Sequence, residues 1–137
     1  MLLRIPPVFA LVALLVFAST YADSLDGVYK GTKEYPTDSP DWCTPKSIPL
    51  TFHVSGSVIT LTTRRSGGQS FSAPVANDGS FKIISYHYLG AGRPSGRVDQ
   101  EWAGVIKGSR IEGIYNGGSA RSGHYCTGPF SASKSPD

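Results

Sequence analysis

Beyond its first 22 residues, the sequence lacks the residues and patterns that build helices. Only four leucines follow residue 22, namely Leu25, Leu50, Leu61 and Leu89. No stretch of useful length repeats its apolar residues at the helical spacing of three and four. Isoleucine, valine, threonine, tyrosine and glycine are frequent instead. This composition is typical of an all-β protein with tight turns.

The sequence also lacks the common motifs of enzymes and metal proteins. It has no Gly-x-Ser-x-Gly nucleophile elbow, and no glycine-rich phosphate loop precedes a helix pattern. The three histidines are scattered and show no metal-ligand spacing. Asp99 and Glu101 share the solvent face of a strand with Arg97, which favours a surface ion-pair stripe over a catalytic pair of carboxylates. We therefore expect no enzyme activity, no metal and no cofactor.

The net positive charge of the chain is too small to indicate a nucleic-acid partner. The formal net charge of the chain is +3, and loss of Arg4 with the first 22 residues lowers it by one. Nucleic-acid-binding domains usually show a much stronger basic excess, clustered on one face or helix. We therefore expect no nucleic acid among the partners.

A long apolar run occurs only at the N-terminus. Arg4 precedes the apolar stretch from Val8 to Ala18, and Thr20-Tyr21-Ala22 is suited to cleavage before the next residue. The run is shorter than the roughly 20 apolar residues that a membrane-spanning helix needs. The pattern predicts a signal peptide at 1–22, a single β-barrel domain at 23–137 without a membrane span, and a periplasmic or secreted location.

Cysteine is scarce, with only Cys43 and Cys126 in the chain. Their spacing fits neither a metal knuckle nor a redox pair. Because secreted proteins reside in oxidising compartments, we expect these two residues to form one disulfide bond.

The segment from Arg97 to Tyr115 predicts a β-hairpin around Gly108-Ser109. A glycine-first two-residue loop suits a type II′ turn, because glycine readily takes a positive φ. Folding the chain back at this loop places three pairs on one inward face. These pairs are Ile106 with Ile111, Gly104 with Gly113, and Trp102 with Tyr115.

The remaining sequence predicts a barrel of about eight antiparallel up-and-down strands, lipocalin-like or avidin-like, with a β-sandwich as the alternative. Gly56-Ser57 repeats the hairpin turn, and Asn77-Asp78-Gly79 predicts a further hairpin between the strands on its two sides. A loop is expected at 116–122, and a frayed tail is expected from residue 132. The other expected strands are 27–34, 48–55, 57–64, 69–75, 80–88 and 123–131.

The predicted topology gathers the short turns at one end of the barrel and the long loops at the other. The candidate ligand-binding residues collect at the long-loop end. Gln69, Ser85 and His87 are expected to point inward there. Arg64, Arg93, Arg97 and Arg121 are expected on the rim, where guanidinium groups would favour an anionic small ligand or an acidic protein surface. The alternative functions for this end are a solvated barrel mouth and a protein-interaction module, such as an inhibitor of a secreted enzyme.

Trp102 and Tyr115 are further candidates for ligand contact. The facing glycines Gly104 and Gly113 would leave space beneath these rings, in which a flat group could stack. The alternative is a barrel corner, where glycine allows sharp coiling of the strands.

Several glycine-based motifs resemble those of a group of small secreted proteobacterial β-proteins with no assigned activity. The motifs are Gly27-x-Tyr29-x-Gly31, Asp78-Gly79-x-Phe81 and Gly104-x-Ile106-x-Gly108-x-x-Ile111-x-Gly113, with a cysteine soon after the first and another opening the last strand. The resemblance implies a periplasmic or secreted location. It carries over no catalytic residue.

Overall fold

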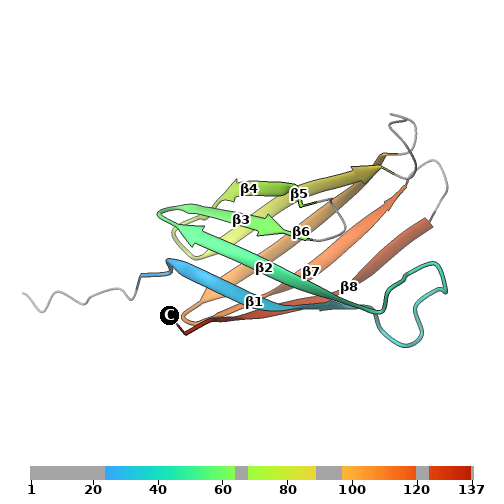
Figure 1. The fold of residues 1–137 in the computed structure, drawn as a ribbon, viewed down its shortest axis with the longest axis horizontal. Coiled ribbons are helices and arrows are strands. Elements are labelled where there is room, and N and C mark those ends of the chain that lie inside the picture. The colour runs from blue at the N-terminus through green and yellow to red at the C-terminus, as the bar shows by residue number, and fades with distance from the viewer. Residues whose placement is uncertain (1–23, 64–67, 89–96, 120–123, 137) are drawn as a thin grey trace, which may run out of the picture.

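The protein forms a nearly closed, eight-stranded antiparallel β-barrel (Figure 1). The computed structural model describes residues 24–63, 68–88, 97–119 and 124–136, and these contain no helix. The strands are β1 (Gly27–Glu34), β2 (Ser47–Ser55), β3 (Val58–Thr62), β4 (Ser70–Pro74), β5 (Ser80–Tyr88), β6 (Arg97–Lys107), β7 (Arg110–Ser119) and β8 (His124–Lys134). The predicted all-β barrel is confirmed.

The strands lie in the order β4-β3-β2-β1-β8-β7-β6-β5. Pairing of β1 with β8 joins the first and last strands, as the even strand number predicted. In Figure 1, β1 to β4 cross in front of β5 to β8. The connection between β1 and β2 projects at one end and is called loop 35–47 here, its last residue being the first of β2. The sheet therefore wraps around a single core, and its two free edges are β4 and β5.

The two glycine-first turns fix their hairpins in the predicted register. Gly108 has φ 58° and Gly56 has φ 61°. Trp102 pairs with Tyr115 across β6 and β7, and Gly104 pairs with Gly113. The β2–β3 pairing follows its turn in the same way, and the inward partners Phe52 and Leu61 are buried.

The two last strands are longer than predicted. β7 continues to Ser119, through the first part of the loop expected at 116–122, and β8 continues to Lys134, into the tail expected to fray. Ala132 explains the second error, since it pairs with Gly31 on one side and Ile111 on the other, and is buried. Cover from both neighbouring strands orders a segment that looked polar and loose in sequence.

The predicted hairpin pairing between β4 and β5 is wrong. The turn itself forms, with Gly79 at φ 84° and the Ala76 amide donating to the Ser80 carbonyl at 2.9 Å, but these two described strands form no ladder. Backbone amides alternate between the two sides of a strand, and the Val75 amide donates toward β3, to Ser57 at 2.8 Å. The neighbouring position facing β5 is Pro74, which has no N–H to donate.

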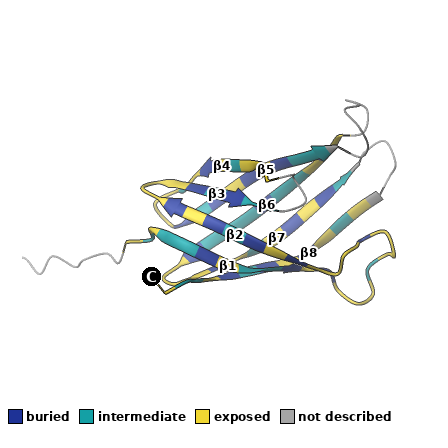
Figure 2. Ribbon diagram, viewed as in Figure 1, coloured by how far each residue is buried: buried dark blue, intermediate teal, exposed yellow. Residues whose placement is uncertain are grey.

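Buried positions recur between more exposed ones along most strands (Figure 2), and the buried side chains form the core. Phe52, Phe81 and Phe130 are in mutual contact, with ring centroids 5.8 to 6.5 Å apart. Gly31 permits the close approach of β1 to β8, because a Cβ there would overlap the carbonyl oxygen of Ser131. The packed centre separates the short-turn end from the end that carries loop 35–47.

Candidate functional site

A short chain of polar groups lies inside the wall formed by β5 and β6. The indole N–H of Trp102 donates to Ser85 Oγ at 2.9 Å, and Ser85 Oγ donates to Gln100 Oε1 at 2.9 Å. Ser85 and Trp102 are 3% and 2% exposed, so these bonds satisfy polar groups that water does not reach. The prediction that Ser85 points inward is confirmed, and its hydroxyl is engaged within the protein.

Lys33 is the unexpected member of the interior. Strand alternation places it on the inner face of β1, where it is only 1% exposed. Its Nζ lies 2.6 Å from the Tyr35 hydroxyl and 4.0 Å and 3.8 Å from the ring centroids of Tyr35 and Tyr115. The Trp102 ring is 5.8 Å away. These aromatic side chains surround the amine and supply favourable cation–π contacts at the loop 35–47 end of the barrel.

Trp102 and Tyr115 pack against each other, with centroids 4.6 Å apart, and both are buried. The space beside the glycine pair is occupied, since a Cβ on Gly113 would overlap the Phe130 ring and one on Gly104 would lie 3.1 Å from it. The glycines therefore make room for the Phe130 ring and leave no niche for a ligand, and the two aromatic rings are part of the core.

The structure does not bring together all three of the polar residues predicted to point inward. Gln69 lies just before β4 and is exposed, so it is not enclosed in the interior with Ser85. The β4–β5 pairing that was expected to bring these residues together does not form. His87 lies on β5 opposite Val98, half-buried, with its Nδ1 atom buried.

Among the predicted rim arginines, Arg97 is the one that the structure describes. Its Nε donates to Asp99 Oδ1 at 2.6 Å, and its guanidinium carbon lies 4.3 Å from the Tyr86 ring centroid. The Tyr86 ring also contacts Phe71 of β4, with the two ring centroids 5.2 Å apart. Arg97 therefore belongs to a side-chain cluster beside the seam, meaning the two free sheet edges β4 and β5 that face each other without a ladder. Arg64, Arg93 and Arg121 lie outside the described residues.

Loop 35–47 is braced by backbone bonds and by the disulfide. The Tyr35 amide donates to the Lys46 carbonyl at its base, and two inner turns are closed by Ser39 to Pro36 and by Cys43 to Pro40. Cys43 and Cys126 are bonded, as predicted, which ties the loop to β8. Trp42 is 51% exposed beside this anchor, and its Nε1 donates to the Tyr125 carbonyl at 3.5 Å.

Pro129 explains why the loop meets β8 at this point. Amides of even-numbered β8 residues face β7, as Lys134 donating to Ser109 shows, so the Pro129 nitrogen faces β1. The ladder between β1 and β8 ends one residue earlier, at Lys33 opposite Phe130. Beyond this point β1 no longer pairs with β8. Here loop 35–47 contacts β8 instead, through the Trp42 hydrogen bond to the Tyr125 carbonyl and through the disulfide at Cys126.

Two of the described titratable groups, Tyr29 and Asp78, have shifted pKa values and lie away from this end. Burial, aided by the Asp26 charge, raises the pKa of Tyr29, whose hydroxyl donates to the Leu25 carbonyl at 2.7 Å. Hydrogen bonds from the Ser80 hydroxyl and amide lower the pKa of Asp78 in the turn after β4. Neither arrangement resembles a catalytic acid and base. Within the described residues, no three His, Cys, Asp or Glu side chains are grouped to hold a metal ion.

Comparison with known proteins found no matching family model, no matching curated protein and no matching solved structure. The resemblance to small secreted proteobacterial β-proteins therefore stays a prediction. In the described ranges, no helix has the length and hydrophobicity that a membrane span requires. What can be said of function rests on the geometry of this chain.

Proposed function

We propose that this protein is a periplasmic or secreted binding module that recognises another protein through loop 35–47 and the adjoining end of β8. The observation that carries the proposal is Trp42, which lies 51% exposed on a loop anchored by a disulfide. Tryptophan and tyrosine supply much of the binding energy of protein interfaces. Tyr125, whose backbone carbonyl accepts the hydrogen bond from Trp42, is itself 61% exposed and adds a second exposed aromatic residue at this end.

The bracing of the loop supports recognition of a folded partner. Four backbone hydrogen bonds, including one from the Thr44 amide to the Trp42 carbonyl, and the disulfide hold the loop in one shape before any partner binds. A surface that is already ordered loses little conformational entropy on binding, which favours affinity. The exposed prolines at 36, 40 and 45 further restrict its backbone.

The predicted anionic small ligand at the barrel mouth has less support from the geometry. The described polar groups beneath the mouth bond to one another, as Ser85 does with Gln100 and Trp102. Lys33, Tyr35 and Tyr115 fill the interior at this end, and Arg97 is paired with Asp99. An exposed aromatic surface is therefore a better candidate for recognition than the interior.

The proposed location rests on the disulfide and on residues 1–22. A disulfide between Cys43 and Cys126 is consistent with an oxidising, extracytoplasmic compartment. The apolar N-terminal run, which lies outside the described residues, supplies a matching export signal. We propose no catalytic role, cofactor or nucleic-acid partner.

Site-specific photocrosslinking tests the proposal. A photoreactive phenylalanine analogue is placed at 42, at 125, or at the control position 58, where Val58 is 46% exposed near the short-turn end. In extracts of the secreted or periplasmic fraction, positions 42 and 125 should give the same protein adduct and position 58 should not. Equal yields at all three positions, or no adduct at 42 and 125, would refute the proposal.

A further inference from the structure

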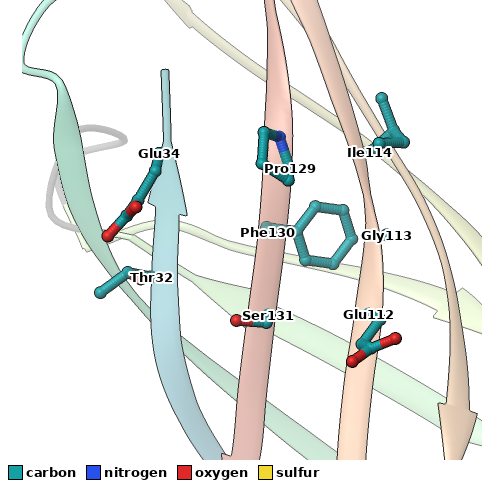
Figure 3. Close-up of a pocket in the computed structure, with 8 residues that line it drawn as sticks. All are labelled: Thr32, Glu34, Glu112, Gly113, Ile114, Pro129, Phe130 and Ser131. Carbon is teal, nitrogen blue, oxygen red and sulfur yellow. The ribbon is translucent and has the colours of Figure 1, made fainter. Parts of the chain in front are cut away.

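The outer wall of the barrel carries a groove that the proposed function does not use. It has a volume of about 550 Å³ and runs across three neighbouring strands, β1, β8 and β7 (Figure 3). Its lining residues are Thr32, Glu34, Glu112, Gly113, Ile114, Pro129, Phe130 and Ser131. All of them belong to the described strands, so the groove is part of the sheet and not of a loop.

The sequence explains the hollow through the size of the outward side chains. Thr32 and Ser131 lie opposite each other on β1 and β8, and both are small. Ile114 pairs with Pro129 on the next cross-strand row and is 51% exposed, so an apolar floor faces water. The outward side chains of β8, Pro129 and Ser131, are small. The flanking strands β1 and β7 carry the longer Glu34, Glu112 and Ile114, so a shallow trough runs over β8.

The polar side chains that line the groove are two carboxylates and two hydroxyls. Glu34 on β1 and Glu112 on β7 place carboxylates on the two sides of β8, as Figure 3 shows. Among the described residues that line the groove, none is a lysine, arginine or histidine. Glu112 is paired with the exposed Arg110 at 3.1 Å, whereas Glu34 belongs to no ion pair among the described residues. Lys30 and Arg110 lie opposite Ser133 on the next outward row, so the negative charge of the groove comes mainly from Glu34, at the end away from them.

We propose that this groove binds a basic, extended segment of a partner protein. A lysine or arginine side chain can lay its methylene stem on Ile114 and Pro129 and carry its charged end to Glu34 or Glu112. The charge complementarity selects this occupant over an acidic peptide, and the exposed apolar floor selects it over a free cation. The groove is a second recognition surface, and its occupancy does not depend on loop 35–47.

Peptide titration followed by NMR tests the inference directly. The probes are an acetylated hexapeptide of alternating arginine and valine and its counterpart with glutamate in place of arginine. The arginine peptide should shift the amide signals of residues 32–34, 112–114, 130 and 131, and 0.5 M salt should weaken its binding because exposed charge pairs are screened. The glutamate peptide should leave these signals unchanged.

Substitutions separate the acidic rim from the rest of the wall. In the Glu34→Gln/Glu112→Gln variant, affinity for the arginine peptide should fall on the order of tenfold, and Ile114→Ser should also weaken it. Glu101→Gln is the matched control, since Glu101 lies outside the groove and pairs with Lys82. Its affinity should equal that of the wild type.

Three outcomes would overturn the inference. These are equal shifts with both peptides, an unchanged affinity in the double variant, and a concentration-dependent dimer that the double variant abolishes. The dimer would assign the groove to a second copy of this chain, as judged by sedimentation velocity. Because the readout is confined to the groove, failure here leaves the crosslinking result at position 42 unaffected.

Discussion

Lys33 shows how a single residue can escape a sequence-based prediction. Alternation from Tyr29 and Gly31 already places position 33 on the inner face of β1, but a charged residue is rarely assigned to a barrel interior. The signal that could have located it is aromatic, because Tyr35 and Tyr115 are inward positions near the same end. Their contacts with Nζ offset part of the cost of removing the amine from water.

We predict that the stem of Lys33 contributes more to stability than its charge. Lys33→Met keeps most of the buried volume and removes the buried charge, so the free energy of unfolding should change by less than about 1.5 kcal/mol. Lys33→Ala should lower it by about 2–4 kcal/mol through the cavity that it leaves. Urea denaturation measures both, with the exposed Lys30→Ala on the same strand as control.

The result that would contradict this prediction is a Lys33→Met variant as unstable as Lys33→Ala. In that case the contacts of Nζ with the Tyr35 hydroxyl and the rings would dominate over packing of the stem.

At the level of strands, two prolines decide where the sheet stops pairing. The turns at 56–57 and 108–109 could be read from sequence, because each needs one glycine in a defined place, and their registers follow. The absence of β4–β5 pairing could not be read from sequence, because it depends on which neighbouring strand the nitrogen of Pro74 faces. That nitrogen faces β5 and has no hydrogen to donate. Pro129 has the same effect on the β1–β8 ladder, and this opens the edge that loop 35–47 covers.

The missing ladder between β4 and β5 predicts uneven hydrogen exchange within β4. The Ser72 amide faces β5, with which β4 forms no ladder, whereas the Ala73 amide faces its partner Ile59 on β3. Ser72 should therefore exchange on the order of tenfold or more faster than Ala73, measured by NMR in deuterated buffer. Amides that join β1 to β8 serve as the protected reference. Equal protection of Ser72 and Ala73 would mean that the seam is closed by hydrogen bonds in solution.

On the scale of the whole molecule, the two ends of the barrel differ in what closes them. The short-turn end is closed by Tyr29, whose hydroxyl contacts both the Leu25 and Gly108 carbonyls. The opposite end carries the braced loop, the disulfide and the exposed aromatic pair. The eight-strand barrel and the disulfide were predictable from turn residues and cysteine count. The candidate recognition surface was not, because the exposure of Trp42 depends on where Pro129 ends a ladder.

Because the disulfide joins the two halves of the chain and also anchors the loop, its removal should have two separable effects. The bond closes a loop of 83 residues, so the Cys43→Ser/Cys126→Ser variant should lose about 4 kcal/mol of unfolding free energy in the chain-entropy model, and Tm should fall on the order of 10–20 °C. At a temperature where that variant is still folded, crosslinking from position 42 should also decrease, since the loop is no longer preorganised.

Calorimetry measures the loss of stability. A reductant gives the control, because it should lower the Tm of the wild type and leave the Tm of the variant unchanged. An unchanged Tm would mean that backbone bonds and Trp42 alone hold the loop on β8, whereas a lower Tm with undiminished crosslinking would show that the bond stabilises the barrel without shaping the recognition surface.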